Sequence, residues 1–581
     1  MLIIPAVILS SFALSDVLIQ DVLPHTTIAV VTVHNAEDLS NKLEAMGVCD
    51  SVSEFTQFMA EDNEDIDLTT FSNTCQNLLD SMGLDKDSMP NCPSGMFQAG
   101  VYPVVDYESG TVNIGLLAIA ELGDSKWSSI IENSITDLAS EMELQIEEVD
   151  LAGEDVWMLS TASDSAAGDI ALPGIDLERM YVTLHTGYLV VGTDPDGVAS
   201  AIGVMNGNEE KDSLSNSKLW SELTSRVKVE GDASGVILLT NLADTVMRID
   251  SSGTAMMILP MVKSFVGDVD GIMETVTFSS EDNAALDATY TLYMGDGRNG
   301  LLGLVSDKTA DVEIPAYVTQ DTLSYSQLQI DMDRVVPFIM ETISTNPMLA
   351  MQIGPQSEQI EQMLQQAFSP LGSQVHMLST GYMPINADSL GYLISVECTD
   401  EPAFSDFLST VMPGMGAEPK DFLGYQIYTV DLGGGMMLPM EMSFSFTVAG
   451  GNVFIGSTRP VEQALRSIAN PEKSTLATND NDALQFISRR NATGWGYSDI
   501  ARSMEIQSQV MEEVSHDMFA DMEAFDPEMA AELRKEFEDG QMQQAAILKI
   551  FSRFFGQTSW NLQTDSNGFT AHAVMLTPSD H

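Results

Sequence analysis

The sequence predicts an α+β protein made of two tandem copies of one module, each a mainly antiparallel sheet covered by helices on one face. A strand, a glycine reversal, a second strand and a helix follow one another at 181–202, and the same order returns at 446–468. The strands form hairpins mixed with helices, without regular alternation of single strands and helices. A chain of 581 residues with 44% hydrophobic residues is too long for one core and apolar enough for two.

The repeated hairpin and helix carry the strongest local signals. The first reversal contains Gly187, and the second contains Gly450 and Gly451. Pro195 and Pro460 suit the first turn of the helix that follows, where a missing N–H costs no hydrogen bond. Both copies therefore predict a hairpin that leads directly into a helix.

Each copy opens with a strand and a helix. In the first copy, the β-branched run 27–33 predicts a strand, and Asn35 is the expected N-cap of a helix over 36–46. In the second copy, a strand over 325–330 is followed by Asp331 and a helix from Met332.

The remaining elements match in order. A Cys-bearing helical insertion at 49–93 corresponds to a helical stretch at 346–368, and the glycine reversal at Gly153 corresponds to one at Gly424. Further matched pairs are 113–121 with 390–397, 214–226 with 476–489, 235–241 with 494–499, and the final hairpins 274–293 with 558–576. Helices are expected at 255–265 and over a longer region, 502–555. The ordered matches predict a duplication, with module 1 at 16–310 and module 2 at 311–581.

The first residues resemble a secretion signal. Residues 2–14 are apolar except for two serines, and small residues at Ala13 and Ser15 suit cleavage after Ser15, which predicts a signal peptide at 1–15. The positive charge usual before such a run is missing, because the first basic residue is Lys42. A start upstream of Met1 and a buried first element remain alternatives. The run therefore predicts that the protein is exported.

Four cysteines are present, and three of them fall in the expected insertion. In an exported protein, two among Cys49, Cys75 and Cys92 are disulfide candidates, with all three pairings open. Cys398 lies on an apolar strand and is expected to be a small core residue. No CxxC or Cys/His spacing that would suggest a zinc site accompanies them.

The net charge of −62 restricts the partners of the chain. A strongly acidic protein repels phosphate backbones and anionic lipid surfaces, so nucleic-acid binding is not expected. Beyond the N-terminal run, no stretch has the length and apolar content of a membrane-spanning helix. We expect a solvated acidic surface around two apolar cores.

A search for catalytic and metal-binding motifs leaves no candidate site. GxSxG, HExxH, P-loop and GxGxxG patterns are absent, and the seven histidines are scattered. The segments 194–197 and 268–271 faintly resemble calcium loops, but they lack the third Asp/Asn and the distal Glu of an EF-hand. The 36 methionines are expected to fill gaps in cores, with an adaptable apolar groove as the alternative.

Five features of the sequence form a recognisable set: LPHTTIAVVTVHNAEDL, the Gly-x-x-Val/Ile-aromatic reversals, GYLVVGTDPDGVASAI, LSNSKLWSEL and GVILLTNLA. Together they resemble a family of exported bacterial proteins described only as a domain of unknown function. The resemblance implies a bacterial protein with a periplasmic or extracellular location and a repeated α+β architecture, and it brings no activity or catalytic residues.

The expected function is that of a non-enzymatic exported protein that binds a protein or another envelope component. Two similar modules can form a cleft or an extended binding face, and such a face requires no catalytic residues. A carrier of an apolar ligand between sheet and helices is the first alternative, and an enzyme of an unrecognised class is the second. No cofactor, metal ion or catalytic residue is expected, and the oligomeric state stays open.

Overall fold

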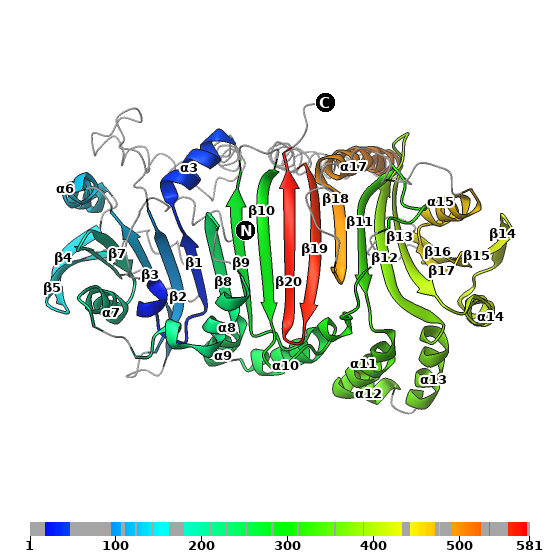
Figure 1. Ribbon diagram of the computed structural model, residues 1–581, viewed down its shortest axis with the longest axis horizontal. Helices are drawn as coiled ribbons and strands as arrows, with labels where there is room; N and C mark the ends of the chain where they lie inside the picture. Colours follow the sequence, from blue (N-terminus) through cyan, green and yellow to red (C-terminus); the bar gives the residue numbers. More distant parts are fainter. Residues whose placement is uncertain are drawn as a thin grey trace. The chain divides into compact units, whose positions relative to one another are not determined.

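The computed structural model shows helices and antiparallel strands in the part of the chain that it describes (Figure 1). It describes residues 18–46, 95–105, 111–122, 125–141, 144–161, 179–208, 211–227, 231–250, 252–279, 284–310, 313–353, 356–386, 389–432, 442–470, 476, 491–523, 534 and 556–577. The expected signal peptide at 1–15, the whole insertion at 49–93 with Cys49, Cys75 and Cys92, and most of 502–555 beyond Glu523 lie outside these residues.

The chain forms two compact units. Unit 1 consists of Met1–Pro260, Val269–Asp282 and Leu286–Gly295, and unit 2 consists of Met261–Asp268, Asn283–Ala285 and Asp296–His581.

Every strand pair in unit 1 is antiparallel. The hydrogen-bonded order is β4 (Leu144–Leu151), β5 (Glu154–Thr161), β6 (Arg179–His185), β7 (Tyr188–Gly192), β3 (Val112–Glu121), β2 (Phe97–Val105), β1 (Ala29–Val33), β8 (Ala233–Leu238), β9 (Gly271–Phe278) and β10 (Ala284–Tyr293). The chain thus adds strands on both sides of the central pair β1–β2, which the expected hairpins alone did not determine.

Helices connect these strands. They are α2 (Ile19–Val22), α3 (Ala36–Ala45), α6 (Ser125–Glu141), α7 (Pro195–Met205), α8 (Lys218–Arg226), α9 (Leu239–Ile249) and α10 (Thr254–Val266), whose residues from Met261 onward belong to unit 2. The side chain of Asn35 accepts a hydrogen bond from Asp38 N at the start of α3, as expected. Asp194 does the same for α7 by accepting from Gly197 N, and Pro195 occupies the first turn.

The tight reversals have the backbone that their glycines predicted. Thr186 and Gly187 have φ values of 49° and 87°, and Ala152 and Gly153 have values of 56° and 84°. Two successive residues with positive φ form the two-residue turn that matches the twist of an antiparallel hairpin.

Unit 2 has the same antiparallel arrangement. Its order is β14 (Pro419–Phe422), β15 (Tyr425–Leu432), β16 (Met442–Ala449), β17 (Asn452–Gly456), β13 (Leu390–Cys398), β12 (Leu371–Gly381), β11 (Thr322–Gln329), β18 (Gly494–Asp499), β19 (Gln557–Asp565) and β20 (Gly568–Leu576). The repeated hairpins, β6–β7 and β16–β17, therefore occupy the same places in the two strand orders.

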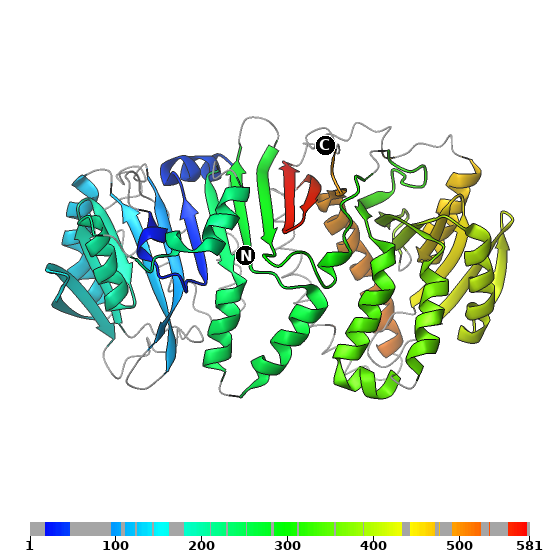
Figure 2. The same cartoon turned by 60° about the horizontal axis from the view of Figure 1, so that its bottom comes forward.

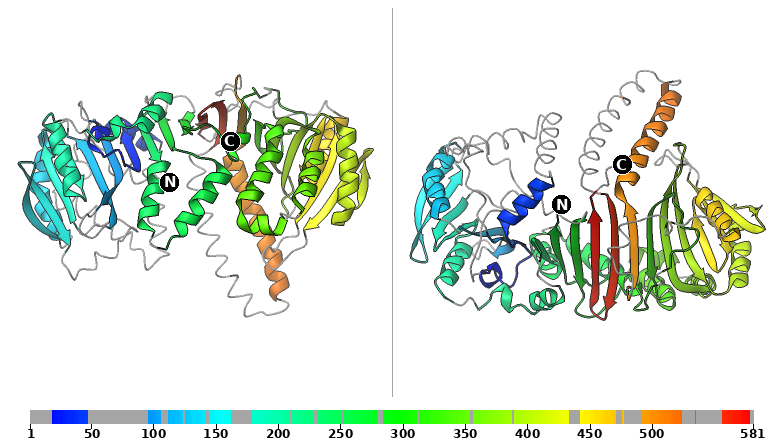
Figure 3. Two further views of the ribbon diagram at one scale, coloured as in Figure 1. Left: turned by 90° about the horizontal axis from the view of Figure 1, so that it is seen from below. Right: turned by 45° about the horizontal axis from the view of Figure 1, so that its top comes forward.

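The described helices of unit 2 differ more from those of unit 1 than its strands do. They include α11 (Met332–Thr345), α12 (Pro347–Ile353), α13 (Ser357–Phe368), α14 (Glu401–Val411), α15 (Thr458–Ala469) and α17 (Ile500–Glu523), which stands out in the right view of Figure 3. Three helices follow β11, where one described helix follows β1.

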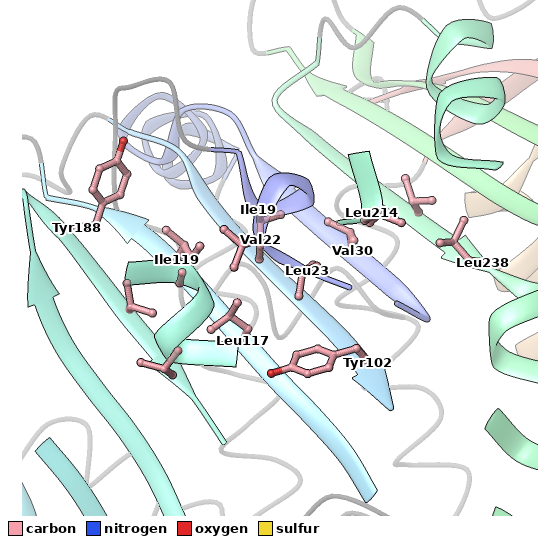
Figure 4. Packing of buried hydrophobic residues seen from close by; sticks show 14 of the residues in the cluster. Ile19, Val22, Leu23, Val30, Tyr102, Leu117, Ile119, Tyr188, Leu214 and Leu238 are labelled. Carbon is pink, nitrogen blue, oxygen red and sulfur yellow. The ribbon is translucent and has the colours of Figure 1, made fainter. Parts of the chain in front are cut away.

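The α+β class and the antiparallel sheets are confirmed, but the expectation of helices on one face is wrong. In unit 1, Val190 packs in a cluster with residues of α2, α7 and α8, some of which Figure 4 shows. Its neighbours Leu189 and Val191 point to the other face, where they pack in a cluster with α6. Alternate side chains of a strand point to opposite faces, so β7 is apolar on both faces because helices cover both.

Unit 2 repeats this arrangement. Phe454 of β17 packs in a cluster with α15, whereas Val453 packs in a cluster with α14. The continuous apolar runs of these strands are thus the pattern of strands buried on both faces. The strands β2 and β12, which the sequence reasoning did not assign, complete the two sheets.

Candidate functional site

Helix α10 exposes apolar side chains on almost every side. Its sequence, TAMMILPMVKSFV, contains one charged residue, and none of its residues is buried. Its exposed large apolar side chains are Met256, Met257, Ile258, Met261, Val262, Phe265 and Val266, with exposed fractions from 36% to 73%. A helix that is apolar all round normally lies in a protein core or in lipid. We call these seven side chains the α10 surface.

The start of α10 is fixed by the acidic turn that precedes it. The carboxylate of Asp250 accepts hydrogen bonds from Ala255 N at 2.5 Å and from Ser252 N at 2.9 Å. The pKa of Asp250 is lowered, chiefly by the hydrogen bond that the Ser252 hydroxyl donates to its carboxylate. A carboxylate at a helix N-terminus also interacts favourably with the positive end of the helix dipole. This turn therefore sets where the apolar helix begins.

The end of α10 is anchored within unit 2. Leu301 N donates to Phe265 O at 2.8 Å, and Lys263 pairs with Asp268 at 2.8 Å. The ring of Phe265 lies 5.9 Å from that of Phe338 on α11. These contacts fix the last turn of α10, although the side chains of Phe265 and Val266 there stay exposed.

Helix α9 adds three apolar side chains to the exposed surface of unit 1. Val246, Met247 and Ile249 are 39%, 40% and 42% exposed. They occupy the last turns of α9, and α10 follows after a short turn (Figure 2). Figure 2 brings both helices forward.

An open cavity of about 490 Å³ lies in unit 2, next to the end of α10. Ten residues line it: Lys263, Ser264, Asp268, Asn299, Gly300, Leu304, Arg334, Pro337, Phe338 and Glu341. Four of them carry charge and three are large and apolar, so the cavity is a mixed polar pocket. A pocket for a purely apolar ligand has a predominantly apolar lining instead.

The titratable groups with shifted pKa values lie elsewhere. Burial raises the pKa of Asp194, although Gly197 N–H and the Tyr102 hydroxyl bond to its carboxylate. Burial lowers the pKa of His34 against the opposing charge of Asp232. The other shifted groups are Lys42, Tyr102, Asp250, Tyr290, Tyr317, Tyr382 and Cys398, and none lines the 490 Å³ cavity. Catalytic sites typically gather such groups in one pocket.

The structure gives ordinary roles to the predicted residues that it describes. Cys398 is a buried free cysteine, as expected. Asp194 caps α7, and Asp270 accepts hydrogen bonds from Thr240 Oγ1 and Gly295 N. Within the described ranges, no group of three or more His, Cys, Asp or Glu side chains could hold a metal ion. No helix in the described part of the chain has the length and apolar character that a bilayer crossing requires.

The sequence reasoning missed the α10 surface. It assigned the methionines to core packing, which is wrong for Met256, Met257 and Met261, and also for Met351 of α12 and Met363 of α13, which are 84% and 47% exposed. A signal was available, because 254–266 contains a single charge in a chain of −62. An apolar run of this length is equally typical of a buried helix, so the sequence did not distinguish the two.

The comparisons with known proteins do not identify the chain. No family model matches it, and no curated protein matches it. Among solved structures, crystal form I of the bacterial protein TP0453 aligns over 46% of this chain and 94% of its own length. The aligned residues are 8% identical and the TM-score is 0.23, which is too low to support an inference about fold or function.

Proposed function

We propose that this is a non-enzymatic binding protein that receives a protein partner on the α10 surface. The observation that carries the proposal is a 13-residue helix with seven exposed large apolar side chains and one charge. Large exposed apolar patches mark interaction sites on soluble proteins. Flexible thioethers such as those of Met256, Met257 and Met261 adapt their shape to a partner.

A protein groove suits α10 better than a lipid surface does. A helix that lies in a membrane interface needs a polar face for the water side, and α10 has Lys263 alone as a charged residue. A helix of 13 residues extends only about 20 Å, which is shorter than the hydrocarbon core. A groove that surrounds the helix can bury all of its sides at once.

The charge of the chain restricts that partner further. A net charge of −62 repels a second copy of the same chain and any acidic protein. A partner with a basic rim around an apolar groove offers charge complementarity and faster association. The partner that we propose is therefore a basic protein with an apolar groove.

We also propose that the two units arose by duplication and that the protein is exported by a bacterium. The matching strand orders support the duplication, and the different helices around them suggest that the copies diverged in their surfaces. The apolar residues 2–14 support export. An N-terminus at Asp16 in protein recovered from the host would support the signal peptide, and an intact Met1 would contradict it.

The alternatives have weaker support. A carrier of an apolar ligand would need a continuous apolar cavity, whereas four charged residues line the 490 Å³ cavity. An enzyme would need reactive groups in one pocket, and the shifted groups of the described residues are dispersed.

The test replaces methionines without changing charge. A variant with Met256, Met257 and Met261 changed to Gln is compared with a control in which Met351 and Met363 are changed to Gln. All five are exposed, so each variant should keep the stability of the parent within about 0.5 kcal/mol per site. A photo-reactive residue at position 257 first identifies the partner in the host, and the purified partner is then titrated.

The α10 variant should bind this partner at least about tenfold more weakly, because each buried methionine contributes about 1.5–3 kcal/mol. The control variant should bind like the parent. Equal weakening by both variants would contradict the proposal. So would an α10-dependent dimer of the chain, or α10-dependent binding to vesicles of zwitterionic lipid in place of a protein.

A further inference from the structure

A second cavity in unit 2, of about 290 Å³, gathers positive charge in a strongly acidic chain. Seven residues line it: Arg298, Val305, Ser306, Asp307, Lys308, Asp331 and Arg334. Three of these are cations, although the chain has 24 Lys and Arg residues against 86 Asp and Glu residues. The lining cations outnumber the two carboxylates, which is the reverse of the ratio in the chain as a whole.

The wall of this cavity is held by backbone hydrogen bonds. Ser306 N donates to Gln329 O at 2.8 Å, and Asp331 N donates to Leu304 O at 2.7 Å. Val305 and Ile330 form an antiparallel bridge between the same two segments. The lining side chains therefore project from a fixed frame, which reduces the ordering cost of binding a ligand.

Arg298 is the buried cation of the cavity. Its side chain is 8% exposed, it pairs with Asp307, and its Nη1 donates to Val305 O at 2.5 Å. Its guanidinium carbon lies 5.5 Å from the centre of the Phe569 ring. The Nε–H is buried and has no hydrogen-bond partner in the described structure. Leaving such a donor unpaired is costly, so Arg298 has capacity for a further acceptor.

The other two cations are available to a ligand. Lys308 and Arg334 are exposed, and among the described residues neither charged group has an ion pair or hydrogen bond. Arg334 lies in the first turn of α11, a 14-residue helix whose N-cap residue, Asp331, makes no side-chain capping bond. The first N–H groups and the dipole of a helix favour an anion at this end.

We propose that the 290 Å³ cavity binds a small oxyanion, a phosphate or a carboxylate, between Arg298, Lys308 and Arg334. Guanidinium groups bind both anions in pairs of parallel hydrogen bonds, and the lysine adds a mobile positive charge. Asp307 is already paired with Arg298, so Asp331 is the lining carboxylate that opposes the anion. This site is separate from the α10 surface, and neither proposal depends on the other.

The test uses inorganic phosphate and acetate as probes on the full chain. Each is titrated by calorimetry at a constant ionic strength of about 0.15 M set with NaCl, where screening over ~8 Å suppresses the long-range repulsion of the chain. The variant Arg334→Gln, alone and with Lys308→Gln, removes exposed cations, so folding should be unaffected. The matched control is Lys420→Gln, an exposed lysine of unit 2 that pairs with Glu462.

We expect the parent and Lys420→Gln to bind at least one probe with equal affinity. Arg334→Gln should bind about tenfold more weakly, and the double variant more weakly still. Preference for phosphate or for acetate identifies the class of anion. If neither probe binds above chloride, or if all variants bind alike, the proposed site is wrong, and the α10 result is unaffected.

Discussion

The two units place different residues at the centre of the same strand order. In unit 1 the main core is mostly aliphatic, with Leu117, Ile119 and Val190 buried on β3 and β7. In unit 2 the corresponding sheet centres on aromatic rings, and the Tyr325 ring lies 5.1 Å from that of Trp495. One arrangement of hairpins and reversals thus accepts two kinds of core, because total volume and patterning matter more than individual residues.

The units also differ in how they satisfy buried polar side chains. In unit 1, Gln98 accepts from Ile19 N at 2.7 Å and donates to Thr32 Oγ1 at 3.2 Å. In unit 2, the Tyr325 hydroxyl lies 2.8 Å from His376 Nδ1 and bonds to Gln327 Oε1 at 3.3 Å. The Gln327 Nε2 group has no partner among the described residues. The centre of unit 2 therefore depends more on one aromatic and polar arrangement.

The largest expected effect is on this aromatic centre. Trp495→Ala should lower the free energy of unfolding by about 3–5 kcal/mol, because the side chain is fully buried against Tyr325. Hydrogen exchange followed by mass spectrometry should show the loss of protection in unit 2. The unit 1 control, Leu117→Ala, should cost about 2–5 kcal/mol and expose unit 1. Equal loss of protection in both units after Trp495→Ala would mean that the cores are not separate.

The next largest effect on stability is expected from adding a side chain at the glycines that end the repeated hairpins. Gly192 pairs with Leu117, and Gly456 pairs with Leu393. A Cβ at Gly456 would overlap the backbone carbonyl oxygen of Tyr392, whereas a Cβ at Gly192 would lie 2.7 Å from a methyl group of Val198. A side-chain methyl can shift, but a backbone carbonyl in a sheet moves only with its strand.

We therefore expect Gly456→Ala to cost about 1–3 kcal/mol or more, and Gly192→Ala clearly less. Urea unfolding of both variants measures the difference. A larger cost at Gly192 would show that the β7–α7 contact is the tighter of the two.

Much of this comparison could be predicted from the sequence because its signals are local. Asn35, Pro195 and the paired positive-φ residues at the reversals act within a few residues, so the strand, turn and helix assignments around them are correct. The hairpin 274–293 and its partner 558–576 were found for the same reason. Alternation and turn chemistry are properties of short segments.

Properties that depend on distant partners could not be predicted. The strands β2 and β12 carry irregular patterns, and their place beside β1 and β11 depends on pairing far along the chain. The exposure of Met257 depends on whether another element covers α10, which composition does not reveal. The same limit applies to the oxyanion cavity, because Arg298, Lys308 and Arg334 come from different segments, two of which the bridge between Val305 and Ile330 joins.

A smaller effect on stability is expected from the N-cap residues of α7 and α15, the helices that follow the repeated hairpins. The Asp194 side chain caps α7, whereas Ser457 makes no capping bond at α15 and instead accepts from Tyr392 N at 3.2 Å. Asp194→Ala should cost about 1 kcal/mol through loss of the cap. Ser457→Ala should leave the start of α15 intact in hydrogen exchange and affect the adjacent strand β13. Fraying of α15 in that variant would contradict this difference.

Asp194→Asn is the matched control, because an amide oxygen can still accept from Gly197 N. Burial raises the pKa of Asp194 in the folded state above its value of 3.8 in the unfolded chain. The contribution of this carboxyl to the free energy of unfolding therefore increases as the pH falls from the folded-state pKa to the unfolded-state pKa. The Asn variant lacks this contribution. It should therefore be at least as stable as the parent at neutral pH, with an advantage that decreases on acidification.

The smallest effect per residue is spread over the acidic surface and should be larger in unit 1. The first half of the chain has more acidic and fewer basic side chains than the second half. Among the described residues, the side chains that pair with carboxylates are Lys42, His185, Lys263, Arg298, Lys420 and Arg466. Most carboxylates therefore have no cation beside them, and their mutual repulsion opposes the compact state.

Screening should relieve this repulsion, because the Debye length falls from ~30 Å at 0.01 M to ~3 Å at 1 M salt. We expect the Tm to rise over this range of NaCl, with a larger gain in protection from hydrogen exchange in unit 1 than in unit 2. Repulsion also raises carboxylate pKa values in the folded state, so the Tm should rise again between pH 7 and about pH 5 as these groups begin to take up protons. Asp250 opposes this trend, because its hydrogen bonds lower its pKa.

NaCl is the appropriate salt because sulfate would also strengthen apolar burial. A Tm that does not change with NaCl would mean that the charges are already neutralised, most simply by bound divalent cations, and an equal gain in both units would mean that the difference in charge between them has no effect on stability.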